Sequence, residues 1–386
     1  MMIRRLPLVA VAAALSLSVA SCSSSATTTS NAPDAGVSEK AQQALDKITG
    51  QVLSKGPDGE TPSAASAADL TPEQIEKIKS LNATAAIVMH YGGNDWATAQ
   101  TNGLKSEFAK LGIKVIATTD ANFKPDKQVS DLETVMTQKP DIIVSIPTDP
   151  VATAGAYKKA AAAGTKLVFM DNIPQGLTAG RDYVSVVSAD NYGNGVVSAH
   201  QMAKAIGGKG KIGLVFHQAD FFVTKQRYEG FKATITKEYP EIQIVEEKGI
   251  AGPDFAGDSQ AAANAMLSKH ADLKGIWAVW DVPAEGVMAA ARAAGRQDLK
   301  IATEDLGKNV AIALAKDQLV VGLGAQVPFD QGVTEARLAA GALIGKKAPA
   351  YVALSALPVD HSNVLDAWKQ VYHEDAPKDI QDSYKK

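Results

Sequence analysis

The sequence contains very little cysteine: Cys22 is the only one among 386 residues. An intramolecular disulfide is therefore impossible, and the folded chain must be stabilised by packed apolar cores. The 6 histidines show no metal-ligand spacing, and without further thiols a zinc site is not expected. The formal net charge of -3 does not indicate the basic surface that nucleic-acid binding requires.

Motifs of the common enzyme classes are missing as well. The chain has no G-x-S-x-G elbow, no P-loop and no metalloprotease motif. Residues 208–213 match G-x-G-x-x-G, but they precede an apolar run instead of following one and opening a helix. The context of a dinucleotide site is therefore absent. We expect no enzymatic activity, no cofactor and no metal.

No apolar run is long enough to span a bilayer. The run over residues 6–20 has about 15 residues, whereas a spanning helix needs roughly 20. It follows two arginines and ends in small residues before Cys22, as in an export signal with a cleavage site. Residues 19–22, Val-Ala-Ser-Cys, resemble the lipobox of bacterial lipoproteins, where the cysteine is lipidated and becomes the first mature residue. The sequence thus predicts a signal peptide over 1–21 and a lipid anchor at Cys22; the alternative is a free thiol behind an ordinary signal peptide.

The segment after Cys22 has little to bury. Residues 23–36 are small and polar, so they are expected to form a disordered spacer. Helical periodicity follows over 38–54, then low-complexity sequence over 57–68. Thr71 and Pro72 then open a second helix with an acid in its first turn. We interpret residues 22–82 as a lipid tether, a spacer and an N-terminal helical segment, to which we assign no function.

From residue 83 onward, short apolar runs alternate with amphipathic stretches. This alternation is typical of parallel strands joined by crossover helices. The expected strands cover residues 85–89, 113–118, 142–146, 167–170, 184–187, 212–216, 242–246, 276–280, 301–303 and 319–323. About ten strands are too many for one small domain, so the sequence predicts an α/β fold with two doubly wound parallel-sheet lobes.

Polar and aromatic residues follow most of these runs at their carboxyl ends, the edge at which open parallel sheets bind ligands. Asp171, Asp281 and Asp305 could be the carboxylates of a hydrolase, but acids spread over three strand ends fit hydroxyl recognition at least as well. Trp96 and Trp280 stand beside polar residues, which favours a sugar-stacking role over simple core packing.

Several motifs together resemble the periplasmic ribose-binding proteins, the solute receptors of ABC sugar importers. The resemblance covers residues 83–372 in order. Its motifs are Gly103 in a helix, Ile146-Pro147-Thr148-Asp149 after the third strand, Asp171 after the fourth, Ala189-Asp190-Asn191 at a crossing between lobes, Arg227-Tyr228-Glu229-Gly230-Phe231 opening a helix, and Ala325-Gln326-Val327-Pro328.

The resemblance implies a type I periplasmic binding protein whose lobes are joined by a three-strand hinge. The N-terminal lobe would comprise 83–189 with 327–355, and the C-terminal lobe 190–326 with 356–386. The ligand contacts that it implies are Asn94, Trp96, Asp171, Asn172, Lys225, Asp254, Trp280, Asp281, Asp305 and Gln326, with His90, Tyr91, His217 and Phe255 as further candidates.

Some of these positions depart from the ribose-type pattern. Asn172 and Lys225 stand where ribose binders have arginine, Trp280 replaces an asparagine, and Ala97 replaces a second aromatic residue. An amide or an ammonium cannot reproduce a bidentate guanidinium, which argues against ribose itself. A neutral ligand with many hydroxyls, such as a sugar alcohol or another monosaccharide, fits better.

The predicted function is therefore that of a monomeric solute-binding lipoprotein on the outer face of the cytoplasmic membrane, presenting a sugar or polyol to an ABC permease. Two alternatives remain open: an exported receptor feeding a membrane chemosensor, and a lipid-anchored glycoside hydrolase. A cytoplasmic sugar-responsive repressor is disfavoured, because an export signal stands where a DNA-binding helix pair would be needed.

Overall fold

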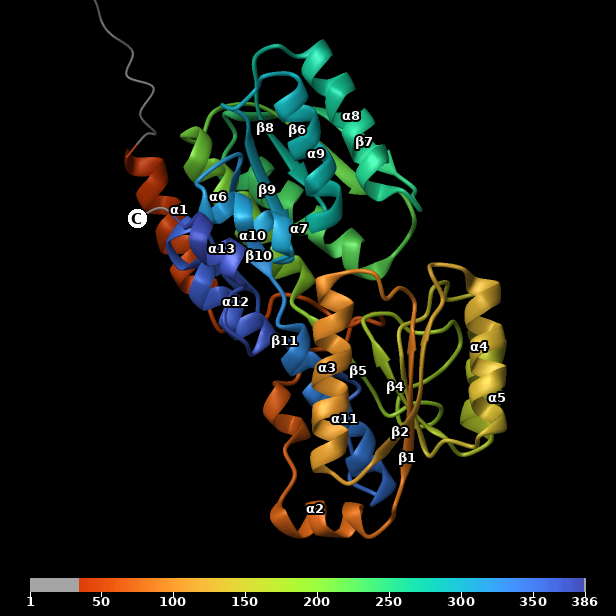
Figure 1. Cartoon of the computed structure of the whole chain (residues 1–386). Helices are drawn as coiled ribbons and strands as arrows, with labels where there is room; N and C mark the ends of the chain where they lie inside the picture. Colours follow the sequence, from red (N-terminus) through yellow and green to blue (C-terminus); the bar gives the residue numbers. More distant parts are fainter. Residues whose placement is uncertain (1–34, 385–386) are drawn as a thin grey trace, which may run out of the picture. The chain divides into compact units, whose positions relative to one another are not determined.

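The computed structural model describes residues 35–384. The predicted signal peptide, Cys22 and nearly all of the predicted spacer lie outside the described residues. The described chain forms two α/β lobes, each built on a six-stranded sheet (Figure 1). Among these residues, no helix has both the length and the apolar character needed to cross a membrane.

The N-terminal lobe has an all-parallel sheet with strand order β11-β5-β4-β3-β1-β2. Helices α3 and α11 cover one face and α4 and α5 the other. The elements are β1 (Thr84–Met89), α3 (Asp95–Lys110), β2 (Lys114–Asp120), α4 (Pro125–Thr137), β3 (Ile142–Ser145), α5 (Ala154–Ala162), β4 (Lys166–Met170), β5 (Ser185–Ala189), α11 (Pro328–Leu343) and β11 (Tyr351–Leu354).

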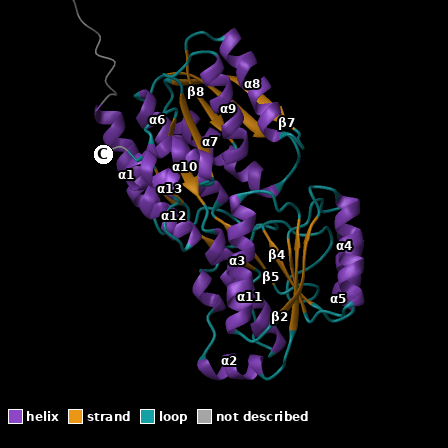
Figure 2. Cartoon of the chain, in the orientation of Figure 1, coloured by secondary structure: helices purple, strands orange, loops and turns teal. Residues whose placement is uncertain are grey.

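The C-terminal lobe has strand order β12-β10-β9-β8-β6-β7, in which only β12 is antiparallel to its neighbour. Helices α6 and α7 lie on one face and α8 and α9 on the other (Figure 2). The elements are α6 (Asn191–Ile206), β6 (Gly210–His217), α7 (Phe222–Glu238), β7 (Ile242–Ile250), α8 (Phe255–Lys269), β8 (Leu273–Ala278), α9 (Asp281–Ala293), β9 (Lys300–Glu304), α10 (Lys308–Ala315), β10 (Val320–Ala325), β12 (Leu357–Val359), η2 (His361–Asn363), α12 (Val364–Tyr372) and α13 (Lys378–Ser383).

Each sheet is doubly wound: helices cover both of its faces, so successive residues of a strand pack against opposite helix layers. Leu214 packs in a cluster with the α6 and α7 side chains, whereas its neighbour Val215 packs with those of α8 and α9. In the other lobe, Val88 faces α4 and α5, and Ile87 faces α3 and α11. Strands buried on both faces read as continuous apolar runs. The predicted fold class is confirmed.

Three connections run between the two sheets: from β5 into α6, from β10 into α11, and from β11 to β12. The first begins at Asp190, which directly follows β5 and caps α6 by accepting a hydrogen bond from Gly193 N at 2.9 Å. An acid at this position satisfies a helix amide that would otherwise lack a partner.

The N-terminal segment is a further connection between the lobes. Helix α1 (Ala35–Ile48) buries Ala41, Leu45 and Ile48 against the α6 side of the C-terminal lobe. The chain then reaches the other lobe, where Ser63 pairs in parallel with Val352 of β11. The short helix η1 (Ala65–Ala68) packs there, and α2 (Pro72–Lys79) begins with a Thr71 capping box.

Residues 49–62, which we call the strap, are held to the first crossing by Asp190. Its carboxylate accepts hydrogen bonds from Leu53 N at 2.7 Å, from Ser54 N at 2.8 Å and from Ser54 Oγ at 2.7 Å. The helical periodicity predicted over 38–54 is wrong at its end, because α1 stops at Ile48 and residues 49–62 form no helix. Short polar and glycine-rich sequence carries no periodic signal, so the contacts that order the strap come from residues more than 100 positions away.

Candidate ligand-binding site

A cavity lies where the carboxyl ends of the strands of both sheets meet. We call it the inner cavity. Its walls come from both lobes and are rich in aromatic rings, with a few polar groups among them. The lining residues are His90, Tyr91, Asn94, Trp96, Asn122, Phe123, Ile146, Asp171, His217, Phe221, Val223, Thr224, Arg227, Pro253, Phe255, Trp280, Val282 and Asp305.

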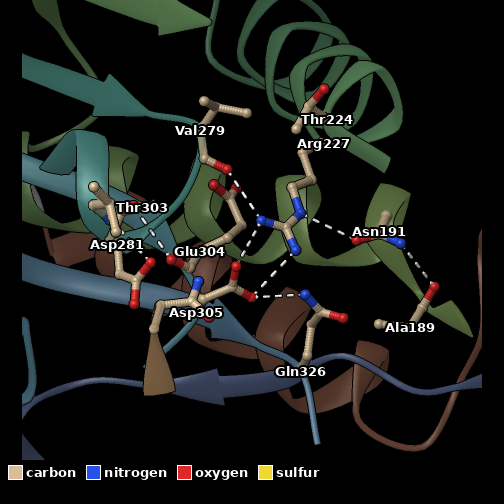
Figure 3. Close-up of polar contacts among 12 residues, drawn as sticks. Ala189, Asn191, Thr224, Arg227, Val279, Asp281, Thr303, Glu304, Asp305 and Gln326 are labelled. Atoms are coloured by element: carbon tan, nitrogen blue, oxygen red, sulfur yellow. Dashed lines mark hydrogen bonds and ion pairs between the residues drawn. The ribbon is translucent and has the colours of Figure 1, made fainter. Parts of the chain in front are cut away.

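The buried pair of Arg227 and Asp305 forms the polar floor of the cavity (Figure 3). The guanidinium is bidentate on the carboxylate, with Nη1 to Oδ2 at 2.9 Å and Nη2 to Oδ1 at 3.1 Å. Its other bonds go to Asn191 Oδ1 at 3.0 Å and to the Val279 carbonyl at 3.2 Å. The side chain of Arg227 is only 2% exposed, so its charge depends on these partners.

Gln326, directly after β10, does not line the cavity but supports Asp305 by donating from Nε2 to its Oδ1 at 2.9 Å (Figure 3). Asp305 itself directly follows β9 with a φ of +64°. This left-handed backbone turns the chain as the strand ends, and aspartate tolerates it better than bulkier residues do. The geometry therefore holds the carboxylate in one place before any ligand arrives.

Asp171 occupies the equivalent place in the other lobe, directly after β4, with a φ of +56°. Its Oδ1 accepts a hydrogen bond from Ser188 Oγ at 2.5 Å, while no partner for Oδ2 is found among the described residues. Burial raises the pKa of the Asp171 carboxyl to about 6, and the Ser188 hydrogen bond and the charge of Arg227 only partly offset that rise. This carboxylate has unused accepting capacity.

The aromatic walls bring the two lobes together. His90 of the N-terminal lobe stacks on Phe221 of the C-terminal lobe with ring centroids 6.2 Å apart, and Phe123 meets the edge of Phe255 at 5.6 Å. Trp280 lies at 4.9 Å from Phe255, nearly perpendicular to it. Such edge-to-face pairs fix ring orientation and leave flat apolar surface toward the cavity.

Two nitrogen atoms in these walls are buried without a hydrogen-bond partner among the described residues: His90 Nδ1 and Trp96 Nε1. Burial lowers the pKa of His90 to about 3, so the imidazole is neutral at physiological pH. A buried polar atom without a partner is costly unless a water or a ligand supplies one. Both atoms belong to residues that line the inner cavity.

The structure brings five of the ten predicted contacts and all four further candidates together, while ligand contact itself stays a prediction. The inner cavity is lined by Asn94, Trp96, Asp171, Trp280 and Asp305, and also by the further candidates His90, Tyr91, His217 and Phe255. Asn94 also caps α3, because its Oδ1 accepts from Ala97 N at 2.9 Å.

Five predicted contacts lie elsewhere. Asp254 caps α8 by accepting from Gly257 N at 2.9 Å. Asp281 is buried beside Gly307, where an added Cβ would come within 2.1 Å of its Oδ2, and Gln326 supports Asp305 from behind. Asn172 and Lys225 line a neighbouring pocket instead. A strand end places a residue near the edge of the sheet, but the local backbone decides into which space its side chain points.

Sequence reasoning missed several cavity residues. Arg227 belongs to a motif that the resemblance places at the start of a helix, but α7 begins at Phe222, so Arg227 lies in its second turn; sequence reasoning does not include it among the contacts. Asn122 and Phe123 follow β2, and both have positive φ, at 49° and 55°. Phe221 directly precedes α7 and lines both the inner cavity and the neighbouring pocket of Asn172 and Lys225. A signal was available for Asn122 and Phe123, because they follow a predicted strand just as the other candidates do.

Residues 85–347 match the family model of the periplasmic binding protein domain. The chain belongs to this family. The ribose import binding protein of Bacillus subtilis (strain 168) is 28% identical over 255 residues, which cover 66% of this chain and 79% of that protein. The D-apiose import binding protein of Actinobacillus succinogenes is 26% identical over 254 residues, covering 65% and 78%.

Solved structures show the same fold. An ABC transporter solute-binding protein from Agrobacterium vitis bound with alpha-D-tagatopyranose has a TM-score of 0.68 at 26% identity, covering 75% of this chain and 99% of that one. Another from the same organism, with bound allitol, has a TM-score of 0.66 at 25% identity, covering 74% and 98%. The chain is thus a ribose-binding-protein-like member of a family of extracytoplasmic sugar-transport receptors, which are not enzymes.

Proposed function

We propose that this protein is the lipid-anchored solute-binding component of an ABC importer. It captures a small neutral polyhydroxylated ligand, a sugar alcohol or a monosaccharide, in the inner cavity and presents it to a membrane permease. The observation that carries the proposal is the pair of strand-end carboxylates, Asp171 and Asp305, one from each lobe, set among aromatic rings.

The polar groups of the cavity suit hydroxyl groups. An ionised carboxylate accepts several hydrogen bonds, and such charge-assisted bonds are stronger than neutral ones. Within residues 35–384, Asp171 Oδ2 and Trp96 Nε1 have no hydrogen-bond partner, so the first can accept from a ligand and the second can donate to one. The faces of Trp96 and Trp280 would cover the C–H faces of a carbon chain or ring.

The charges of the cavity argue against an anionic ligand. Arg227 is the one Lys or Arg side chain among its lining residues, and both of its terminal nitrogens already bind Asp305. Lys225 instead pairs with Asp220 at 3.4 Å, with both side chains exposed. A ligand carboxylate or phosphate would therefore meet two carboxylates and no free cation.

Contact with both lobes supports a role in presentation to a permease. A ligand that touches both lobes favours the arrangement in which they meet, because only differential affinity can shift a conformational equilibrium. One protein contact already reinforces this arrangement: Lys308 N of the C-terminal lobe donates to Asp95 Oδ2 of the N-terminal lobe at 2.8 Å.

A thermal-shift screen tests the ligand class. Pentoses, hexoses and the matching sugar alcohols are compared with their sugar acids and sugar phosphates, since a ligand that binds the native state raises the melting temperature with its concentration. We expect a neutral sugar or polyol to give the largest shift, with calorimetry confirming one site per chain. A response confined to the acids or phosphates would refute the proposed ligand class.

The proposed anchor needs its own experiment, because Cys22 lies outside the described residues. We expect the wild-type chain to incorporate labelled fatty acid and to fractionate with membranes, and the Cys22→Ser variant to do neither. Lipid-free wild-type protein, or a membrane-bound Cys22→Ser variant, would refute lipid anchoring at this residue. Stable anchoring by a thioether-linked diacylglyceryl group is expected because two acyl chains hold where one does not.

A further inference from the structure

A second pocket, which we call the outer chamber, lies next to the inner cavity. The two share Phe221 as a common wall. Residues from both lobes and from the strap line the outer chamber: Pro57, Pro150, Asn172, Ile173, Asp220, Phe221, Phe222 and Lys225. Asp171 and Asn172 follow each other in sequence, and each lines a different space.

Asn172 is the feature of the outer chamber that calls for a ligand. The residue is only 3% exposed, and neither Oδ1 nor Nδ2 of its side chain has a hydrogen-bond partner among the described residues. A buried amide with all of its bonding capacity free is rare in folded proteins. It offers one acceptor and two donors, the complement of a hydroxyl or an amide group.

The remaining walls suit the carbon skeleton of such a group. Pro57, Pro150 and Phe222 present apolar surface, while Lys225 and Asp220 pair with each other at the exposed rim. Pro57 is part of the strap. Two residues before it, the Lys55 carbonyl accepts a hydrogen bond from Gln226 Nε2 of α7 at 2.9 Å, which ties this part of the strap to the C-terminal lobe. Pro57 lies before the segment 85–347 that matches the family, so this wall belongs to the N-terminal extension.

We propose that the outer chamber is a second ligand subsite, which binds a neutral hydroxyl- or amide-bearing group attached to the sugar or polyol in the inner cavity. The ligand class is then a glycoside or a disaccharide, with one unit on each side of Phe221. This inference rests on the proposed function and extends it. Asn172 makes the polar contacts of the second unit, and Pro57 and Phe222 cover its apolar face.

Calorimetry on matched ligand pairs tests this subsite with the purified full chain. The probes are xylose and xylobiose, glucose and cellobiose, and galactose and melibiose. The variants are Asn172→Ala and Pro57→Gly, and the control is Asn264→Ala, an exposed asparagine on α8. We expect at least one disaccharide to bind about tenfold more tightly than its parent sugar, a difference of about 1.4 kcal/mol.

Asn172→Ala and Pro57→Gly should remove that advantage and leave the affinity for the parent sugar within about twofold of wild type, and the control should change neither. Equal weakening of sugar and disaccharide by Asn172→Ala would place this residue in the inner site and overturn the second subsite alone. Tight binding of monosaccharides or alditols together with exclusion of every disaccharide would also overturn only the subsite. If no sugar, glycoside or polyol binds, both the proposed function and the second subsite are wrong.

Discussion

Arg227 and Asp305 form a bidentate ion pair at the floor of the inner cavity, with nitrogen–oxygen distances of 2.9 and 3.1 Å. The arginine comes from α7 and the aspartate from the end of β9, so the pair joins two elements of the C-terminal lobe beneath the ligand. We therefore expect Asp305 to stabilise the fold by neutralising Arg227, in addition to binding the ligand.

Asp305→Ala should strongly destabilise the protein. The change leaves the buried charge of Arg227 without its main partner, which typically costs about 3–5 kcal/mol. Urea unfolding measures the loss. The matched control is Asp298→Ala, which breaks the exposed pair with Arg296 and should cost less than about 1 kcal/mol. Equal effects of the two substitutions would contradict the importance assigned to the buried pair.

Asp171→Asn should weaken ligand binding without unfolding the protein, because among the described residues Asp171 has no ion-pair partner and its Oδ2 has no hydrogen-bond partner. Losing a charged hydrogen-bond acceptor costs about 1.5–3 kcal/mol, which corresponds to roughly 10- to 150-fold in affinity. Calorimetry with the ligand found by thermal shift gives the affinity. The control, Asp366→Asn, changes an exposed residue of α12 and should bind like wild type; unchanged affinity in Asp171→Asn would remove this residue from the site.

Glu304 should make the unliganded protein less stable as the pH rises. Burial raises the pKa of Glu304 from 4.5 to about 8, against the lowering effects of the Arg227 charge and of hydrogen bonds from Ser198 and Trp277. The folded state therefore holds its proton more tightly than the unfolded state, so this stabilisation is complete below pH 4.5 and is lost as the pH rises toward about 8.

The measurement for Glu304 is the free energy of unfolding between pH 5 and 8, in wild type and in Glu304→Gln. The substitution keeps an oxygen that can accept from Ser198 Oγ and Trp277 Nε1 but cannot ionise. Because each pKa unit corresponds to about 1.4 kcal/mol, the wild type should lose several kcal/mol more than the variant over this range. Glu374→Gln, at an exposed site, serves as the control. Parallel pH profiles of wild type and Glu304→Gln would show that Glu304 titrates normally.

Ser54→Ala should loosen the strap. Ser54 Oγ donates to Asp190 Oδ1 at 2.7 Å and accepts from Tyr192 N at 3.0 Å, and the residue is buried. Removing the hydroxyl takes one of three hydrogen bonds from Asp190 Oδ1 and removes the acceptor of the Tyr192 amide, at a cost of about 1–3 kcal/mol. Chemical denaturation should show this loss, and faster amide exchange should appear in residues 49–62. Ser66→Ala, at an exposed position of η1, should be neutral; a stable, slowly exchanging Ser54→Ala variant would mean that other contacts hold the strap.

Much of the fold could be predicted from the sequence, because the apolar runs alternate with amphipathic stretches at a regular spacing. Thr71 and Pro72 also marked the start of α2 correctly. The antiparallel edge strand β12 was not predicted, since a strand of three residues is too short to show an alternation of apolar and polar residues. The strap was missed for a different reason: its order comes from Asp190, far away in sequence.

The candidate site was predicted less completely than the fold. Asp171 and Asp305 both line the inner cavity, because parallel strands bring their carboxyl ends to one edge, and their contact with a ligand stays a prediction. The neighbouring Asn172 and Asp281 follow strands too, but Asn172 lines a different pocket and the Asp281 carboxylate lies beside Gly307. The backbone turn at the strand end decides where each side chain lies, and residue type and spacing do not reveal it.

The N-terminal sheet takes its edge strand β11 from residues near the end of the chain, and the C-terminal sheet takes β12 from the same region. Neither sheet has its full set of strands until residues 351–359 are available to pair. Such long-range pairing slows folding, because the entropy of closing large loops is lost before the contacts form. Each lobe therefore depends on residues 351–359 for its complete sheet, and removing them would leave β5 and β10 as unpaired edges of the two sheets.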